Sequence, residues 1–379
     1  MLGRRVAITG LGVVSTCGIG KDAFWAGLHG PGITGKQWIT IDDWNPDPYF
    51  ANPKVARRAD RVEQFAVAAA EEAFAQAGEI GVDPRRFGVI VGTGVGGLGT
   101  LEEQVQIRLE KGERRVSPFL VPMMMANASG AAISMRYGLR GPNETVCTAC
   151  AAATHALGYA ARTIAMGRCD AVVSGGSEAA ATPSSLAGFG NMTALSTTGS
   201  SRPFDAERDG FVMGEGSAIF ILEEWEHAVA RGATILGEIL GAGSNADAHH
   251  ITAPSPGGVG AIDCMRLALD DAGLRPDQIT YVNAHGTGTA LNDRVETHAI
   301  HPCQRSRASA AAYSAASCGT CAIAQACSAS LALPGAVPTP LATVEERFGA
   351  RATSASSIAS KASASITARA PCEASASRA

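Results

Sequence analysis

Apolar and polar positions change their period repeatedly along residues 1–300 of this chain. Short β-branched and aliphatic runs predict buried strands, and stretches with an apolar residue every three or four positions predict helices. In one such stretch Val62, Phe65, Ala66 and Ala69 fall on one helical face, and Gly78 is placed to end the helix. The predicted strands are 6–9, 87–91, 170–174, 218–222 and 235–240, and the predicted helices are 21–28, 61–76, 123–137 and 226–230. Strands that alternate with helices predict an α/β fold.

One stretch changes from strand to helix within a few residues. Residues 144–148 are rich in β-branched side chains and small helix-forming residues follow from Ala149, so Cys150 falls at the turn. A thiol in the first turn of a helix meets unpaired backbone N–H groups and the positive end of the helix dipole. These lower its pKa and can stabilise an oxyanion. A buried structural cysteine in an alanine-rich helix fits this stretch equally well.

Two segments far apart in the chain share one pattern. Residues 73–94 and 268–286 each combine the end of a helix, a glycine stop, a proline turn, an apolar strand and a glycine turn. This duplication predicts two similar α/β halves. His285 takes in the second copy the strand-end position that Thr93 takes in the first, and strand ends are where α/β folds place catalytic groups.

Composition narrows the classes of protein. The net charge of -4 argues against general nucleic-acid binding. Ten cysteines without a secretory leader favour a reducing cytosol over a disulfide framework. Residues 1–20 are basic and then apolar, but their glycines favour a strand and loop over a signal peptide. No apolar run is long enough to predict a membrane span.

Three short motifs point to other chemistry. Gly92-x-Gly94-x-x-Gly97 follows a predicted strand, as in dinucleotide-binding proteins, but no second strand ending in an acidic residue follows promptly. Cys147-x-x-Cys150 could be a redox or zinc pair, although Cys318-x-x-Cys321 lies in poorly patterned sequence. His249 and His250 are adjacent, so on an extended segment they would point to opposite faces rather than to one metal.

Taken together, the motifs of residues 3–300 resemble the chain-elongating β-ketoacyl-acyl-carrier-protein synthases of the thiolase-fold superfamily. The matching stretches are Val6-Ala-Ile-Thr-Gly-Leu-Gly12, Gly92-Thr-Gly-Val-Gly-Gly-Leu98, Arg115-Val-Ser-Pro-Phe119, Tyr137-Gly-Leu-Arg-Gly-Pro142, Thr148-Ala-Cys150, Ser174-Gly-Gly-Ser-Glu-Ala179, Ser201-Arg-Pro-Phe-Asp205, Arg208-Asp-Gly-Phe-Val-Met-Gly-Glu-Gly216 and Asn283-Ala-His-Gly-Thr287. Many independent motifs in the family's order make this resemblance specific.

The resemblance implies a layered αβαβα fold of two duplicated halves. Residues 1–240 would form the half that carries the nucleophile, and 241–300 would begin the second half. It implies a homodimer with the strand 143–147 at the two-fold axis, substrates delivered by acyl carrier protein, and no metal or other cofactor.

The resemblance also assigns residues. Cys150 would be the nucleophile, and His285 would be one of two histidines that stabilise the malonyl thioester enolate. Asp293 and Glu296, which share a helix face because they are three apart, match the family's supporting carboxylates. Val95 matches a position at the floor of the acyl pocket.

Four basic residues precede or begin the predicted helix 61–76. Lys54, Arg57, Arg58 and Arg61 could form an ordinary solvated face or a docking site for the acidic carrier protein.

The pattern is lost after Ile300. Residues 301–379 are rich in Ala, Ser and Arg, hold half of the cysteines and have no histidine after His301. The family's second catalytic histidine, the lysine that precedes it and the Gly-Phe-Gly-Gly loop are missing. A wrong-frame translation and a natural low-complexity extension both fit. Such sequence cannot bury enough apolar surface to fold, so we expect residues 305–379 to be disordered or poorly packed and the second sheet to be incomplete.

Three functions are therefore compared. The leading one is a decarboxylating Claisen condensation in fatty-acid elongation, in a chain that is impaired because the second histidine and the lysine are absent. The alternative is a non-catalytic partner like the chain-length factors of polyketide systems, which lack the nucleophile that Cys150 supplies here. A generic cysteine hydrolase is the third, and it would need a histidine that activates water.

Overall fold

A computed structural model describes residues 3–304 of the chain. These residues form one seven-stranded mixed sheet with strand order β2-β1-β6-β5-β3-β4, and β7 also pairs with β1. The strands are β1 (Val6–Ser15), β2 (Gly18–Ile19), β3 (Phe87–Gly92), β4 (Asn143–Val146), β5 (Ala171–Glu178), β6 (Gly216–Glu224) and β7 (Gly237–Glu238). The helices are α1 (Lys21–Leu28), α2 (Pro53–Ala56), α3 (Arg61–Ala77), α4 (Leu98–Lys111), α5 (Leu120–Met124), α6 (Ala128–Tyr137), α7 (Ala152–Ala165), α8 (Pro183–Asn191), α9 (Trp225–Ala230), α10 (Val259–Ala272) and α11 (Ala290–Gln304).

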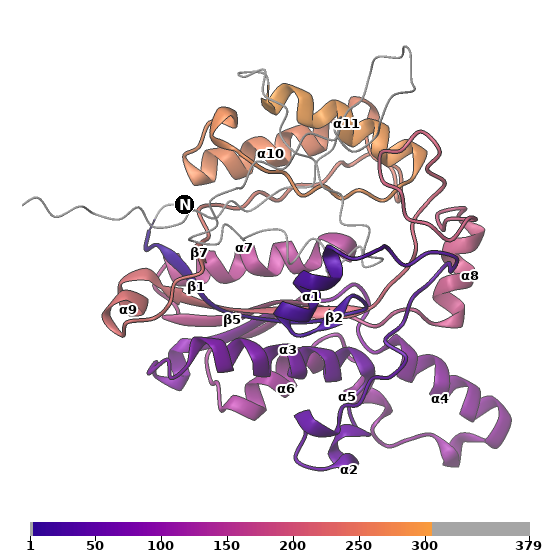
Figure 1. Ribbon diagram of the computed structural model, residues 1–379. Helices are drawn as coiled ribbons and strands as arrows, with labels where there is room; N and C mark the ends of the chain where they lie inside the picture. Colours follow the sequence, from indigo (N-terminus) through magenta and orange to yellow (C-terminus); the bar gives the residue numbers. More distant parts are fainter. Residues whose placement is uncertain (1–2, 305–379) are drawn as a thin grey trace, which may run out of the picture.

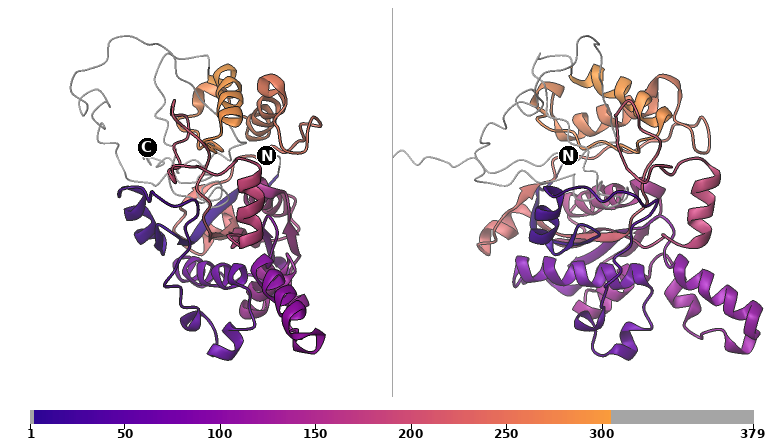
Figure 2. Two further views of the ribbon diagram at one scale, coloured as in Figure 1. Left: turned by 90° about the vertical axis from the view of Figure 1, so that its right-hand side faces the viewer. Right: turned by 45° about the vertical axis from the view of Figure 1, so that its right-hand side comes forward.

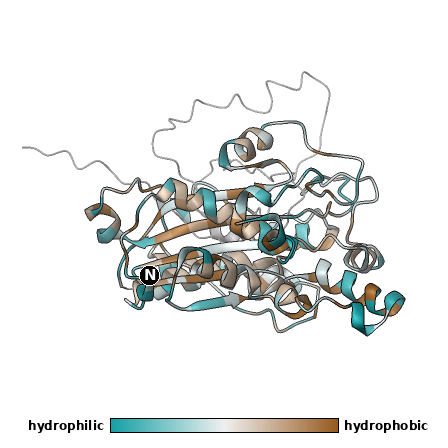
Figure 3. Cartoon of the chain, turned by 90° about the horizontal axis from the view of Figure 1, so that it is seen from below, coloured by the Kyte–Doolittle hydropathy of each residue, from teal (hydrophilic) through white to brown (hydrophobic). Residues whose placement is uncertain are grey.

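The elements are stacked in layers. Helices α3 and α6 cover one face of the sheet and α7 covers the other, with α10 and α11 beyond α7 (Figure 1). Apolar side chains fill both interfaces. Phe65 of α3 lies in the core between α3 and the sheet, and Leu157 of α7 lies in the core between α7 and the sheet. Both are fully buried. The central strands accordingly carry mainly hydrophobic colours when the molecule is seen from below (Figure 3). None of the helices within residues 3–304 has the length and apolar character needed to cross a membrane.

Strand β1 is longer than predicted. It continues through Gly10 and Gly12 to Ser15, with a shift in its pairing to β6 between Ile8 and Gly10. A Cβ atom on Gly12 would lie 1.9 Å from the carbonyl oxygen of Ala69, and one on Gly10 would lie 2.2 Å from that of Ala73. These glycines therefore allow α3 to pack directly on the strand, and they do not end it.

The predicted helix 123–137 is two helices. Helix α5 ends at Met124, Met125 adopts an extended conformation, and α6 begins at Ala128. The turn 93–97 packs into this break, because a Cβ on Gly97 would lie 2.2 Å from the carbonyl oxygen of Met123. A contact with a distant segment of the chain thus accompanies the break, which the local pattern did not reveal.

The duplicated segments begin alike. Helices α3 and α10 end at Gly78 and Gly273, with φ of 70° and 65°, and a 3-10 turn follows each one at Pro84–Arg86 and Pro276–Gln278. In the first copy β3 follows. In the second copy the apolar run 279–284 would be the corresponding strand, but no strand is found there within residues 3–304.

The predicted strand 235–240 is reduced to β7. From Gly241 onward the chain leaves the first sheet and packs against α10, where a Cβ on Gly241 would lie 2.5 Å from the amide nitrogen of Ala272. Arg162 of α7 donates to the carbonyl of Ala242 (2.5 Å), whose own N–H donates to Asp271 of α10 (2.9 Å). These bonds join the second half to α7. Of the predicted tail, residues 301–304 belong to α11, and 305–379 lie outside the described residues.

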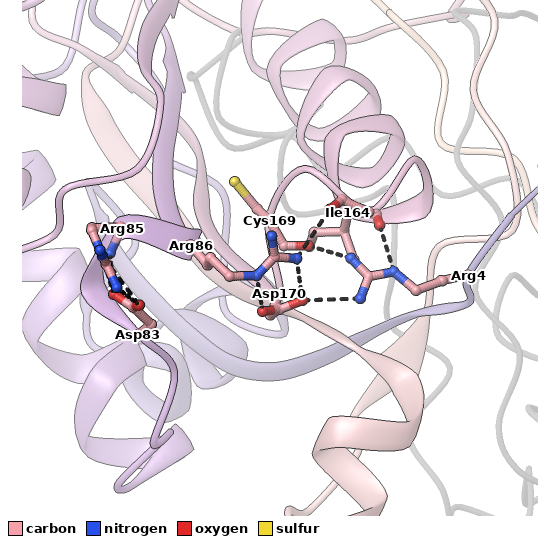
Figure 4. Close-up of polar contacts among 8 residues, drawn as sticks. Arg4, Asp83, Arg85, Arg86, Ile164, Cys169 and Asp170 are labelled. Carbon is pink, nitrogen blue, oxygen red and sulfur yellow. Dashed lines mark hydrogen bonds and ion pairs between the residues drawn. The ribbon is translucent and has the colours of Figure 1, made fainter.

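A polar network joins three elements at the start of β5. Asp170 accepts hydrogen bonds from Arg4 (2.9 Å) and Arg86 (2.7 Å), and Arg4 also donates to the carbonyls of Cys169 and Ile164 (Figure 4). The bonds from Arg86 and then Arg4 lower the pKa of Asp170 to about 2. This network ties β1 and β3 to the connection between α7 and β5.

Candidate active site

The predicted change from strand to helix is observed at Cys150. Strand β4 ends at Val146, a 3-10 turn spans Ala149–Ala151, and α7 begins at Ala152. Ala149 has a φ of 51°, which turns the chain sharply before the cysteine. Neither the 3-10 turn nor α7 has a side-chain cap at its N-terminus, and Cys150 is exposed. The geometry therefore favours a reactive thiol over a buried structural one.

Glycines at two strand ends bring this turn onto the sheet. A Cβ on Gly92, the last residue of β3, would lie 2.4 Å from the carbonyl of Ala152, and one on Gly176 in β5 would lie 2.5 Å from the Cβ of Ala153. Both contacts involve the first turn of α7, next to Cys150. Side chains at these positions would push the nucleophile away from the sheet.

The glycine-rich turn that follows β3 holds a carboxylate. Glu178, at the end of β5, accepts from the backbone N–H of Gly94 (2.6 Å), and Thr93 Oγ1 lies 3.4 Å from the same carboxylate oxygen. Burial raises the pKa of Glu178 to about 7, although hydrogen bonds from the turn oppose this. A carboxylate here occupies the amides that a dinucleotide phosphate would need and repels its charge, so the dinucleotide interpretation is not supported. Glu178 belongs to a motif that carried the family resemblance, but its contact with the turn was not inferred from the sequence.

The cysteine pair does not resemble an activated redox pair. Neither Cys147 nor Cys150 forms a disulfide, and burial together with the charge of Glu178 raises the pKa of Cys147. A raised pKa favours the thiol over the thiolate that would bind metal or attack a disulfide. On a separate loop, His250 accepts hydrogen bonds from the backbone N–H groups of Thr252 and Ala253.

His155 supports the turn that carries Cys150. His155, one turn into α7, forms a hydrogen bond of 2.9 Å with the hydroxyl of Thr148. Burial, and then the charge of Arg162, lower the pKa of His155. Thr148 and His155 therefore span the residues on either side of Cys150.

His285, the candidate catalytic histidine, lies on a loop whose backbone N–H groups donate to two carboxylates. Glu296 of α11 accepts from the backbone N–H groups of His285 (2.8 Å) and Gly286 (3.1 Å). Asp293, one helical turn earlier, accepts from Gly288 N–H (3.1 Å). Both carboxylates are buried and reach the same loop, as expected from their spacing.

Asp293 keeps a cationic partner. The lysine of the family pattern is missing, but Arg208 Nε lies 3.2 Å from Asp293 Oδ2. The same oxygen accepts from the N–H of Phe204 (2.8 Å), whose φ is 76°. Arg208 belongs to a motif that carried the family resemblance, but its pairing with Asp293 was not inferred from the sequence.

The imidazole of His285 is neutral at physiological pH. Burial lowers its pKa to about 4, and the nearby charge of Asp293 opposes that shift only in part. A neutral imidazole has one N–H that can donate to a developing oxyanion without a proton being taken up first.

Residues 193–215 connect the two sides of the site. Helix α8 follows the end of β5, and the chain rises from it toward α10 and α11 (Figures 1 and 2). Gly210 N–H donates to the carbonyl of Gly288 (3.1 Å). This hydrogen bond joins residues 193–215 to the loop of His285.

The four basic residues have different surroundings. Lys54 and Arg57 are exposed, and the guanidinium of Arg58 lies 4.3 Å from the ring centre of Phe119. Arg61 instead binds Glu215, which is buried, with Nη2 2.5 Å from Oε1. Arg61 therefore anchors the start of α3, and its charge is largely neutralised.

Comparison with known families identifies the class of protein. Residues 33–228 match the family model "Beta-ketoacyl synthase, N-terminal domain", and residues 236–329 match "Beta-ketoacyl synthase, C-terminal domain". The chain belongs to the beta-ketoacyl synthase family, as its motifs predicted. The second match continues beyond residue 300, where those motifs stop.

Individual relatives support this assignment. The chain is 44% identical over 319 residues to 3-oxoacyl-[acyl-carrier-protein] synthase 2 of Synechocystis, covering 78% of this chain and 76% of the relative. It is 40% identical over 336 residues to the mitochondrial 3-oxoacyl-[acyl-carrier-protein] synthase of Arabidopsis thaliana, covering 78% and 73%. Relatives of this kind are acyltransferases that perform condensation.

Solved structures confirm the fold. A beta-ketoacyl synthase from Burkholderia phymatum aligns with a TM-score of 0.73 and 34% identity, covering 84% of each chain. A ketosynthase solved with the acyl-carrier protein of a type II polyketide synthase aligns with a TM-score of 0.75 and 31% identity, covering 86% of this chain and 84% of that one. The thiolase-like α/β fold predicted from the sequence is therefore confirmed.

Proposed function

We propose that this chain is a β-ketoacyl-acyl-carrier-protein synthase of fatty-acid elongation. The Cys150 thiolate attacks an acyl thioester, so that the acyl group moves to the cysteine and the carrier thiol leaves. Malonyl-carrier protein then loses CO₂, and its enolate attacks the acyl-cysteine. This forms the new C–C bond, yields β-ketoacyl-carrier protein and frees Cys150.

The observation that carries this proposal is the setting of Cys150. The thiol is exposed in the first turn of a helix that lacks a side-chain cap, directly after a strand end. Backbone N–H groups in such a turn can stabilise the oxyanion of the tetrahedral intermediate. In the second step the neutral His285 would donate to the enolate oxygen, while Asp293 and Glu296 hold its loop.

The present sequence should complete only the first step efficiently. Residues 301–379 contain neither the second histidine nor the lysine of the family pattern. Loss of one oxyanion donor typically lowers a rate by about two to three orders of magnitude. We therefore expect condensation to be at least this much slower than in a family member that retains both groups.

Intact-mass measurement with acyl-carrier protein tests the proposal. The mass of the chain should rise by one acyl group, and Cys150→Ala should abolish the rise while Cys147→Ala leaves it unchanged. Absence of acylation would contradict the proposal. Steady formation of β-ketoacyl product, followed in the same reaction with malonyl-carrier protein, would contradict the expected impairment.

A cytosolic homodimer is part of this proposal. Strand β4 is at the edge of the sheet, and Asn143 and Glu144 are exposed there. An unpaired strand edge can be completed by a second copy of the chain. Light scattering after size exclusion should give twice the mass of one chain, and Thr145→Pro should reduce that mass to one chain.

Carrier-protein docking at the basic residues is also proposed. Among the four basic residues, Lys54 and Arg57 are exposed, and the guanidinium of Arg58 lies beside Phe119. Lys54→Glu combined with Arg57→Glu should raise the KM for acyl-carrier protein but not for a small acyl thioester. Lys36→Glu, which reverses an exposed charge elsewhere, is the matched control.

A chain-length-factor-like partner is the second candidate. The ishigamide ketosynthase/chain length factor structure aligns with a TM-score of 0.72 and 34% identity. This candidate predicts that Cys150 stays unmodified by acyl-carrier protein and that the chain instead raises the activity of a catalytic partner. The acylation experiment separates the two functions.

A further inference from the structure

Glu178 supports the turn 93–97 from one side. Its carboxylate accepts from Gly94 N–H at 2.6 Å, and hydrogen bonding from the N–H of Val95 also acts on its pKa. Thr93 Oγ1 lies 3.4 Å from the same oxygen and itself accepts from Gly96 N–H (3.1 Å). A single side chain, 84 residues away in sequence, thus organises the turn.

The turn is closely packed on its other side. A Cβ on Gly96 would lie 2.8 Å from the Cα of Ala126, and one on Gly97 would lie 2.2 Å from the carbonyl oxygen of Met123. There is no room on the Glu178 side either, because a Cβ on Gly94 would lie 2.6 Å from the carboxylate. The position of the turn is therefore set by Glu178 and by the break between α5 and α6.

Val95 is the only residue of the stretch 94–97 that carries a side chain, and this side chain is exposed. Residues 94–97 are Gly, Val, Gly and Gly, and the Val95 side chain is 52% exposed. We infer that Glu178 is a positioning residue for substrate length: it fixes where Val95 stands and so determines how long an acyl chain Cys150 accepts. This inference rests on the proposed function and on the family resemblance, which assigns Val95 to the floor of the acyl pocket.

The expected effect follows from the size of the change. One methylene in an apolar pocket changes discrimination by about tenfold or more. Without Glu178 the turn loses the acceptor of its amides, and Val95 can withdraw. The ratio of long-chain to short-chain acylation should then rise by about tenfold, which is the effect of roughly one methylene.

The experiment measures the acylation rate of Cys150 with a series of acyl-carrier proteins of increasing chain length, by intact mass. Glu178→Ala should shift the preferred length upward. Glu178→Gln keeps one acceptor oxygen and should shift it less, and this variant serves if the alanine variant does not fold. Glu103→Gln makes the same change on the exposed surface of α4 and should leave the profile unaltered. Alkylation of Cys150 by iodoacetamide should proceed at the parent rate in all variants.

A double substitution tests whether Glu178 acts through Val95. If it does, Glu178→Ala should add no further shift in a Val95→Ala background. An equal loss of rate at every chain length would indicate a merely structural role and overturn the inference, as would an unchanged profile. Either result leaves the proposed function standing, because the parent is still acylated. A parent chain that no acyl-carrier protein acylates would overturn the proposed function and this inference with it.

Discussion

In the first copy of the repeat, α3 ends at Gly78 and β3 leads to Thr93; in the second copy, α10 ends at Gly273 and the chain leads to His285. The first strand end lies between β4 and β5, and its turn is held by Glu178 from β5. The loop of His285 is held by carboxylates of α11, the next helix along the chain.

The comparison separates the geometry from the chemistry. Both copies bring a glycine turn to a buried or half-buried carboxylate that accepts its N–H groups. They differ in the residue placed there, a hydroxyl in one and an imidazole in the other. The helix end and the glycine turn thus recur in both copies, whereas β3 has no counterpart strand at 279–284, and the carboxylate that supports the turn comes from a different element in each copy.

The largest predicted effect concerns the carboxylates of the second copy. Asp293→Ala would leave Arg208 without its anion and remove the acceptor of two backbone N–H groups. Breaking a buried pair costs about 3–5 kcal/mol, and we expect about 3 because Arg208 remains partly exposed. Urea unfolding should show this loss, and hydrogen exchange should locate it at residues 201–210 and 285–289.

Asp277→Ala is the matched control. Asp277 pairs with Arg275 on the surface, where such a pair contributes at most about 1 kcal/mol. Equal losses for the two variants would mean that Asp293 does not support the second copy as the geometry indicates.

The next effect compares equivalent positions of the repeat. Gly92 corresponds to Ala284, but only Gly92 lies under the first turn of α7. Gly92→Ala should destabilise the chain by about 1–3 kcal/mol through overpacking and should slow alkylation of Cys150. Ala284→Gly should cost only about 0.5–1 kcal/mol, through backbone entropy, and leave alkylation unchanged.

Thermal unfolding and iodoacetamide kinetics measure both consequences. If Gly92→Ala is as mild as Ala284→Gly, the close approach of the two backbones at Cys150 is not a constraint on the site.

Local patterns predicted what local interactions determine. The change from β4 to α7 at Cys150 and the glycine ends of α3 and α10 follow from residues adjacent in sequence. Three other features depend instead on contacts between distant segments: the length of β1, the break at Met125 and the hydrogen bonds between Glu178 and the turn 93–97. The sequence predicts that the first strand ends before Gly10, because the contact of Gly10 with Ala73 is not visible in the local pattern.

The strand expected at 279–284 failed for a related reason. Its apolar pattern matches that of β3, but a strand also needs a neighbouring strand to pair with, and an apolar pattern does not reveal whether the fold provides one. For the site, the sequence identified Cys150 and His285 as candidates, whereas the pairing of Arg208 with Asp293 required the three-dimensional arrangement.

The smallest effect is an acid dependence confined to the first copy. Arg86, just before β3, binds Asp170, whereas Gln278 takes the equivalent position in the second copy and carries no charge. The folded-state pKa of Asp170 is about 2 against an ordinary value of 3.8, so the unfolded chain binds the proton more readily. The contribution to stability is therefore fully present above pH 3.8 and is lost as the pH falls toward 2. Because the pair is partly exposed and screened by solvent, we expect it to contribute about 1 kcal/mol.

Asp170→Asn should lower stability by this amount at pH 7 and by less at pH 3, whereas Asp277→Asn should change little at either pH. Urea unfolding at both pH values measures the difference, and an Asp170→Asn loss that stays constant between them would mean that the charge of Asp170 is not what joins β1, β3 and β5.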